Sequence, residues 1–228
     1  MTTKLAPFIK SLRQKHGFSQ VFVAERLGIS RSSYMAVEKG TRELTLEEAK
    51  SLVQLFGITF EDLSKMTAPK YDKYKQMILA YLHAFTTPHD GKVPKTKLAK
   101  LLYLADFAWY YNHLESMSGA QYLRREFGPV PDDYFRALDE LEGAGKINIE
   151  RKGEAILVSL GAGGRKPAVD LLSSDEKKLI GAITKKWKDK KTREIVDFTH
   201  QQLPYKLCTQ DEVIPYELIT QEDPDYVY

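Results

Sequence analysis

Glycines divide the first third of the chain into short segments that have the periodicity of a helix. In each segment the apolar residues recur every three to four positions, and a glycine follows, as it commonly does at the end of a helix. Ser19 and Ser30 stand where a side chain can cap the segment that follows. This pattern predicts four or five short helices, over residues 5–16, 20–27, 31–39, 46–56 and 60–63.

The net charge of the chain is concentrated in its first third. The 228 residues carry a formal charge of +3. Residues 1–69 hold ten basic and seven acidic side chains, whereas residues 70–228 hold 24 of each. Pro69 disfavours a helical conformation for the residue before it. We therefore predict an N-terminal domain over residues 1–66, a linker over 67–71 and a second domain over 72–228, which the length allows.

The number of cysteines and the hydropathy of the chain predict its cellular location. Cys208 has no second cysteine for an internal disulfide, and the N-terminus lacks a basic-then-apolar leader. The longest apolar stretch, residues 98–111, has about 14 residues, short of the roughly 20 that span a bilayer. We therefore expect a cytoplasmic protein that does not enter a membrane.

The second and third segments have the spacing of a helix-turn-helix, in which two helices are separated by a turn of three or four residues. Ala24 suits a close crossing of the two helices, Gly28 suits a left-handed turn, and Ile29 can fill the core from the turn. The pattern reads Ser19-Gln20-x-x-x-Ala24-x-x-Leu27-Gly28-Ile29-Ser30-x-x-x-Tyr34-x-x-x-Glu38-x-Gly40. This run resembles the lambda-repressor-like (XRE-type) DNA-binding family over residues 5–64.

The resemblance implies that the second helix of the motif lies in the major groove of DNA. Gln20 would hydrogen-bond a phosphate, and the forked donors of Arg31 match two acceptors on guanine. Ala36 stands where the family often has glutamine, so one polar base contact is not expected. For Arg31 and Arg42 the alternative is a solvated surface charge. The residues expected at base edges are Ser30, Arg31, Ser32 and Met35, and those expected at the DNA backbone are Gln20, Lys39, Thr41 and Arg42.

Arg13 and Glu38 occupy positions where this family often has an internal ion pair. The resemblance implies that the pair ties the first helix to the end of the recognition helix. We therefore assign both residues to the structure of the domain and not to DNA contact.

The longer remainder combines helical periodicity with one alternating stretch. The helix near residues 94–113 is apolar nearly all round, as a central buried helix is. Residues 146–151 and 155–160 alternate apolar and polar side chains, which predicts a hairpin, and residues 119–127 predict a strand that enters a rigid turn at 128–131. The fold class is therefore mainly α with a small antiparallel β component: a lambda-repressor-like helical bundle and a C-terminal α+β domain. Other helices are predicted over residues 71–85, 173–190 and 192–202, and one that starts at Asp132 or Asp133 and runs through Leu141.

A second resemblance lies in this remainder. Its residues are Lys100-Leu101-Leu102-Tyr103-Leu104-Ala105-Asp106, Tyr122, Phe127-Gly128-Pro129-Val130, Asp197-x-Thr199-His200-x-x-x-Pro204 and Ile214-Pro215-Tyr216. They resemble the Panacea (SocA/GepA-like) antitoxin domain over about residues 72–220, although Tyr205 stands where the family often has tryptophan. The resemblance implies an antitoxin that neutralises a protein toxin by direct contact. Together with the DNA-binding domain, it implies repression of the antitoxin's own operon.

The surface that would bind the toxin is predicted from residue type alone. Aromatic and arginine side chains anchor many protein interfaces. The expected contacts are Tyr110, Tyr111, Tyr122, Arg124 and Arg125.

No set of residues has the spacing of a catalytic or metal site, so we expect neither an enzyme nor a cofactor or metal. His113, His200 and Cys208 do not fit the paired spacing of zinc ligands. Asp106 lies on the apolar helix and must be hydrogen-bonded, paired or open to a cleft. It is either a functional carboxylate or a buried acid that orients Tyr103, Tyr110 or an arginine.

Charge is distributed unevenly near the C-terminus. Residues 185–193 hold six bases and one acid, whereas residues 211–228 hold six acids and no base. These two blocks either pair within the chain or serve a partner.

Two functions are compatible with these patterns. The first is an antitoxin whose partners are its cognate protein toxin and operator double-stranded DNA. The second is a phage or bacterial transcriptional repressor whose C-terminal domain dimerises or senses an effector. Because helix-turn-helix repressors usually bind two-fold operators as dimers, we expect a homodimer.

Overall fold

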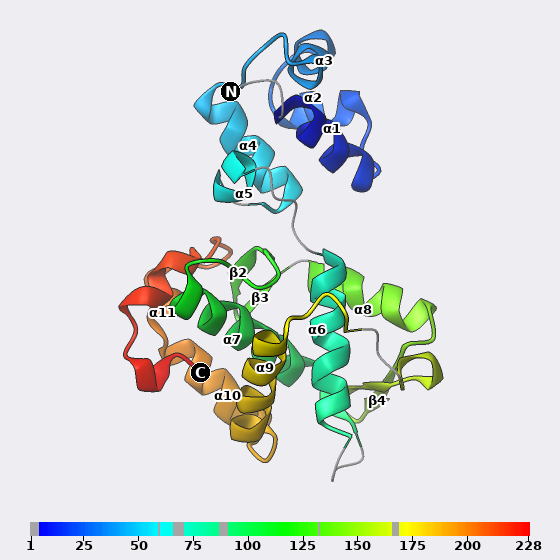
Figure 1. The fold of residues 1–228 in the computed structure, drawn as a ribbon, viewed down its shortest axis with the longest axis vertical. Helices are drawn as coiled ribbons and strands as arrows, with labels where there is room; N and C mark the ends of the chain where they lie inside the picture. Colours follow the sequence, from blue (N-terminus) through cyan, green and yellow to red (C-terminus); the bar gives the residue numbers. More distant parts are fainter. Residues whose placement is uncertain (1–4, 59, 66–70, 87–90, 132, 166–168) are drawn as a thin grey trace. The chain divides into compact units, whose positions relative to one another are not determined.

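The chain forms two units, residues 1–69 and 70–228 (Figure 1). Each unit has an apolar core of its own. The structure is a computed structural model that describes residues 5–58, 60–65, 71–86, 91–131, 133–165 and 169–228. Residues 67–70 of the expected linker lie outside the described residues.

The first unit contains the five predicted helices. Ser19 and Ser30 begin two of them as predicted, because each side chain accepts a hydrogen bond from a backbone N–H of the first turn. Gly28 has a φ of 68° in the turn between these helices, a conformation that glycine adopts without strain. The helices are α1 (Leu5–Lys15), α2 (Gln20–Arg26), α3 (Arg31–Lys39), α4 (Leu46–Phe56) and α5 (Phe60–Lys65).

The apolar faces of these helices meet in one small core. Ala24 is buried where α2 packs against α3, as its small size predicted. Tyr34 lies on the buried face of α3, so the opposite face of that helix is left to solvent. The other buried apolar residues are Ile9, Leu12, Val23, Leu27, Val37, Leu52, Val53, Phe56, Ile58 and Leu63.

The second unit is built around α7 (Lys95–His113), which is buried over most of its length. It packs against α6, α9 and α10, together with the strand β3 and the short 3₁₀ helix η2 (Tyr216–Gln221), and Tyr134 of α8 donates a hydrogen bond to its Lys95 carbonyl at 2.7 Å. A central position explains why its sequence lacks a polar face, as predicted. The other α-helices are α6 (Tyr71–Ala84), α8 (Asp133–Gly143), α9 (Ser174–Trp187), α10 (Thr192–Gln201) and α11 (Leu203–Leu207).

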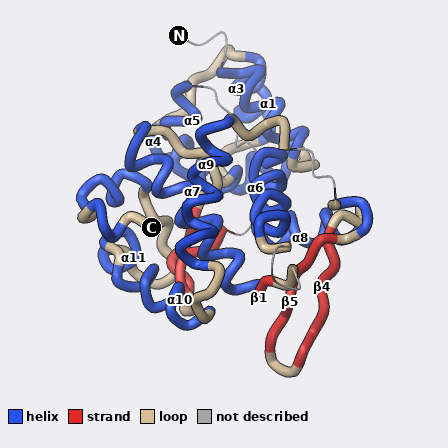
Figure 2. The backbone as a smooth tube through the Cα atoms, turned by 60° about the horizontal axis from the view of Figure 1, so that its bottom comes forward, coloured by secondary structure: helices blue, strands red, loops and turns tan. Residues whose placement is uncertain are grey.

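Two small antiparallel sheets complete this unit. The predicted hairpin is confirmed as β4 (Ile147–Lys152) and β5 (Ala155–Leu160), which Figure 2 shows as a long ribbon. The short strand β1 (Val93–Pro94) pairs with β5, so the order is β1-β5-β4. The second sheet pairs β2 (Tyr122–Arg125) with β3 (Gly128–Pro131).

The prediction of a rigid turn at residues 128–131 is wrong, because these residues form β3. Pro129 and Pro131 are two residues apart, so the N–H groups that they lack would both have pointed to the same edge of the strand. Gly128 and Val130 remain free to pair with β2, while the Pro129 carbonyl faces the other way and accepts a hydrogen bond from Lys100 at 2.9 Å. The turn itself lies at residues 126–127.

The C-terminal segment closes over the second sheet. Its backbone hydrogen-bonds to β2 at Tyr122 and Arg124, and Leu123 forms a β-bridge with Val213. The segment then forms η2 and the 3₁₀ helix η3 (Pro224–Tyr226); a further 3₁₀ helix, η1 (Ala162–Gly164), follows β5. An isolated β-bridge thereby joins residues 90 positions apart in the chain.

Candidate nucleic-acid interface

The beginning of α3 presents polar side chains to solvent. Ser30 caps the helix, and its Oγ accepts a hydrogen bond from the Ser33 N–H at 3.1 Å. Arg31 and Ser32 follow in the first turn, and both are exposed. Met35, one turn further on, is half-buried. The four residues predicted at base edges therefore lie on the first two turns of one helix, with Arg31 extending from its N-terminal end.

The end of α3 is fixed to the other helices through Glu38. Arg13 of α1 donates to both oxygens of this carboxylate, with Nε–Oε1 at 2.5 Å and the second bond at 3.2 Å. Arg13 also donates to the Phe18 carbonyl at 3.0 Å. Gln20, the first residue of α2, donates its side-chain amide to Glu38 at 3.0 Å. One carboxylate thus joins α1, α2 and α3, as expected for Arg13 and Glu38.

Burial and hydrogen bonding act on Glu38 in opposite directions. Burial raises the pKa of its carboxyl, but the hydrogen bonds from Arg13 and Gln20 lower it more, so the net pKa lies below the usual value. Glu38 therefore stays ionised and holds Gln20 in place. The Gln20 amide nitrogen, expected to approach a phosphate, is engaged within the domain.

The last residue of α3 and the loop after it form a second polar cluster. Lys39 and Thr41 are exposed, and the Thr41 hydroxyl donates to the Ala36 carbonyl at 3.2 Å. Arg42, predicted to contact the DNA backbone, forms a two-point ion pair with Glu48 at 2.6 and 3.0 Å. These hydrogen bonds hold the pKa of Glu48 below its usual value.

The role of Glu48 could have been read from the sequence. Thr45-x-x-Glu48 is a capping box, in which the Thr45 hydroxyl accepts from the Glu48 N–H and the Glu48 carboxylate accepts from the Thr45 N–H. The same carboxylate binds Arg42 and so positions the loop between α3 and α4. The capping pattern was the missed signal.

In the second unit, the five residues expected to bind a toxin are placed differently from one another. Tyr122 is fully buried and Tyr110 nearly so, because both face the core around α7. Tyr111 and Arg124 are half-buried, and Arg124 donates to the Tyr205 carbonyl at 3.1 Å. Arg125, 41% exposed, forms an ion pair with Asp211. Tyr110 and Tyr122 therefore offer no surface to a partner.

Asp106 is a buried acid with three donors. Its oxygens accept from the Ser118 N–H at 2.7 Å, the Ser118 hydroxyl at 2.5 Å and the Tyr122 hydroxyl at 2.8 Å. Burial raises the pKa of Asp106 to about 6 despite these bonds. Of the two interpretations of Asp106, the structural one fits, but its tyrosine partner is Tyr122 and not Tyr103 or Tyr110, because β2 places the Tyr122 hydroxyl beside the carboxylate.

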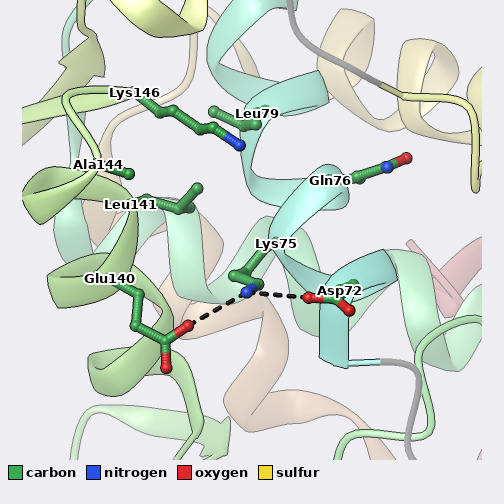
Figure 3. A pocket seen from close by; sticks show the side chains of 8 residues that line it. All are labelled: Asp72, Lys75, Gln76, Leu79, Glu140, Leu141, Ala144 and Lys146. Atoms are coloured by element: carbon green, nitrogen blue, oxygen red, sulfur yellow. Dashed lines mark hydrogen bonds and ion pairs between the residues drawn. The ribbon is translucent and has the colours of Figure 1, made fainter.

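A pocket of about 310 Å³ lies between α6 and α8 (Figure 3). Lys75 lies at its edge and pairs with Asp72 at 2.9 Å and with Glu140 at 3.1 Å. Lys146 also lines the pocket, so its two lysines balance its two acids, and Leu79, Leu141 and Ala144 supply apolar walls. Within the described ranges, no three His, Cys, Asp or Glu residues gather as a metal site. No described helix is long and apolar enough to cross a bilayer.

Comparison with known protein families divides the chain in the same way. A helix-turn-helix family model matches residues 9–63, which include α2 and α3. The model of the antitoxin SocA-like Panacea domain matches residues 98–205, which include most of α7, the β2–β3 hairpin and α10. Both resemblances drawn from the sequence are confirmed.

Individual relatives are transcriptional regulators and match over short stretches. An HTH-type regulator of Methanocaldococcus jannaschii is 34% identical over 24% of this chain and 83% of its own length. An HTH-type regulatory protein of Pyrococcus abyssi is 37% identical over 28% of this chain, which spans only 21% of that relative. The cryptic phage CTXphi transcriptional repressor RstR of Vibrio cholerae is 25% identical over 35% of this chain and 72% of its own length. No solved structure gives a significant match.

Proposed function

We propose that this protein, which belongs to the HTH-type transcriptional regulators and joins their DNA-binding domain to a SocA-like Panacea domain, is an antitoxin that neutralises a protein toxin and represses its own operon. The observation that carries the proposal is this pairing of domains in one chain. A Panacea domain supplies the contact with the toxin, and the helix-turn-helix supplies the contact with the operator.

The DNA-binding step follows from the geometry of α3. The first turn of a recognition helix lies against base edges in the major groove. Ser30, Arg31 and Ser32 occupy that turn and are exposed, so Arg31 can direct its forked donors at a guanine. Lys39 ends the helix and Thr41 follows it, where contacts reach the phosphates. The Glu38 hydrogen bonds hold α3 in the orientation that this requires.

The operator contact is tested with Arg31→Ala and the DNA upstream of the protein's own gene. Loss of a two-point guanine contact should cost about 1–3 kcal/mol of binding and relax selectivity at one base pair. The control is Arg165→Ala, which removes one exposed arginine from the second unit. If Arg31→Ala and Arg165→Ala bind the operator equally well, Arg31 does not read a base.

The antitoxin activity is tested by co-expression with the product of the adjacent gene. The proposal expects that this product arrests growth alone, that the chain restores growth, and that the two proteins co-purify. Absence of both rescue and complex would contradict an antitoxin role. Among the residues first expected at this contact, Tyr111, Arg124 and Arg125 remain in the proposal because they keep exposed or half-exposed side chains.

The similarity to the phage repressor RstR favours a second candidate. In that case the protein is a transcriptional repressor whose C-terminal unit dimerises or senses an effector. An adjacent gene whose product is harmless, together with operator binding that persists in its absence, would favour this function over the first.

A further inference from the structure

The end of α9 and the start of α10 form a strongly basic surface. We call it the lysine turn; it consists of Lys185, Lys186, Lys188, Lys190, Lys191 and Arg193. All of these side chains are exposed except that of Lys188, which is half-buried. Asp189 and Glu194 are the acids within residues 185–194, so the stretch has four excess positive charges. Residues 70–228 as a whole are neutral, so this charge is concentrated in one place.

The acidic C-terminal segment, residues 211–228, forms no side-chain ion pair with the lysine turn among the bonds described below. Four of its six acids serve contacts elsewhere, two of them with backbone N–H groups within three residues. Asp211 pairs with Arg125, while Glu212, Glu222 and Asp223 accept from the N–H groups of Thr209, Leu203 and Asp225. Lys186 does reach this segment, but it binds a main-chain oxygen of Tyr228. Of the two alternatives for the opposite charge blocks, these contacts favour a partner outside the chain.

Apart from Lys186, which binds Tyr228 and faces the Phe198 ring, the cations of the lysine turn contribute little to the fold. Lys191 and Arg193 lie where α10 begins, and positive charge there opposes the helix dipole. Lys190 pairs with Glu194 at 3.4 Å and Arg193 with Asp197 at 3.7 Å. Exposed pairs of this kind stabilise a protein only slightly. Folding therefore does not account for so many positive charges.

The backbone beneath these cations is held firmly. Lys97 of α7 is 4% exposed, and its Nζ donates to the carbonyls of Lys188 at 3.0 Å and Lys190 at 2.5 Å. Trp187, at the end of α9, is buried and packs against Phe198 of α10. A turn fixed in this way presents its side chains to a partner without a large ordering cost.

We infer that the lysine turn binds the phosphate backbone of double-stranded DNA, an inference that rests on the DNA-binding part of the proposed function. Lysine is depleted in protein–protein interfaces, whereas lysine and arginine contacts with phosphates supply most non-specific affinity for DNA. A helix-turn-helix unit of charge +3 gains affinity from a second phosphate-binding surface on the same chain.

The test uses two full-length variants that have the same net charge. The first carries Lys185→Gln, Lys188→Gln and Lys191→Gln in the lysine turn. The matched control carries Lys152→Gln, Lys177→Gln and Lys206→Gln, which are exposed lysines of the same unit outside this surface. Binding of a random-sequence duplex is measured by fluorescence anisotropy over a series of salt concentrations, and thermal unfolding checks that both variants are folded.

The first variant should bind the duplex roughly tenfold more weakly. The slope of log affinity against log salt concentration should decrease in magnitude by about 2 to 3, because three fewer cations contact phosphates. The control should stay close to the unmodified chain. Equal behaviour of the two variants would overturn the inference. So would a lysine-turn variant that binds DNA normally but no longer neutralises the toxin, because the surface would then belong to an acidic protein partner.

The outcome is separable from that of the proposed function. If the unmodified chain binds no duplex at all, both the operator contact and the lysine turn fail. If the lysine-turn effect appears but the adjacent gene product is neither bound nor neutralised, the inference stands and only the antitoxin role fails.

Discussion

At the scale of single residues, Glu38 links the helices of the helix-turn-helix unit to one another. It receives hydrogen bonds from Arg13 and Gln20 and so connects three helices. Its side chain is 4% exposed and that of Arg13 13%, so solvent screens this pair far less than a surface pair. Removing one partner leaves a buried charge without compensation.

Arg13→Ala should therefore destabilise the first unit by about 3–5 kcal/mol, comparable to the whole stability of so small a domain, and should abolish DNA binding by unfolding it. Thermal unfolding and operator binding of the same sample check this. The control is Arg26→Ala, an exposed residue of α2. An Arg13→Ala variant with unchanged melting but no binding would contradict the structural role.

Lys100 predicts a pH dependence of stability in the second unit. It is 2% exposed, and burial lowers its pKa to about 7. In the unfolded chain a lysine has a pKa of about 10.4. Between these values the unfolded state binds the additional proton, so stability should rise with pH from about 7 to 10.

The check compares Lys100→Met with the unmodified chain by denaturant unfolding at pH 7 and pH 9. The increase in unfolding free energy over this interval should be about 2 kcal/mol larger in the unmodified chain. Equal increases in both proteins would show that Lys100 is not desolvated as the structure has it.

At the scale of elements, the β2–β3 hairpin depends on one close approach. Gly128 has a φ of 92°, and a Cβ there would lie 2.7 Å from Lys100 Cε and 3.1 Å from His200 Nε2. The hairpin is thus pressed against α7 and α10 at a place where only glycine fits. Tyr205 adds a further attachment, because its hydroxyl donates to the Arg125 carbonyl at 2.9 Å.

Gly128→Ala should combine backbone strain with this collision and cost about 2–4 kcal/mol. Gly153→Ala is the matched comparison, since Gly153 has a φ of 61° but open space around it. It should cost about 1 kcal/mol from the backbone alone. The denaturant midpoints of unfolding of the two variants are compared. Equal decreases in stability would mean that the hairpin can shift to make room for the added Cβ.

At the scale of the whole molecule, each of the two units has its own core. The first contains the helix-turn-helix, and the second is built around α7 and contains the residues matched by the Panacea domain model. Residues of the Panacea pattern that are far apart in the chain meet in this unit: Gly128 lies against Lys100 and His200, and Tyr122 binds Asp106. The pattern therefore reflects a packed core as much as a contact surface.

A single helix-turn-helix unit of charge +3 binds an operator weakly. We therefore predict a homodimer on a two-fold operator. Gel filtration with light scattering, with and without operator DNA, measures it. A chain that stays monomeric even when bound to its operator would contradict the prediction.

Much of the first unit was predictable because its signals are local. Ser19, Ser30 and Gly28 act on backbone groups within a few residues of themselves, so helix ends follow from the sequence with little help from packing. The turn assigned to residues 128–131 failed for the opposite reason. Proline and glycine there are compatible with a turn or an edge strand, and the choice was made by pairing with β2.

The sequence alone thus determined the helices of the first unit, the two families and the uneven charge. The tertiary structure decided that Tyr122 faces Asp106 in the core, that Arg42 is held by Glu48, and that Lys97 supports the lysine turn from 91 residues away. Helix caps and periodicity act over three or four residues. Burial and long-range pairing depend on which distant segments pack together, and this information does not reside in any short stretch of the chain.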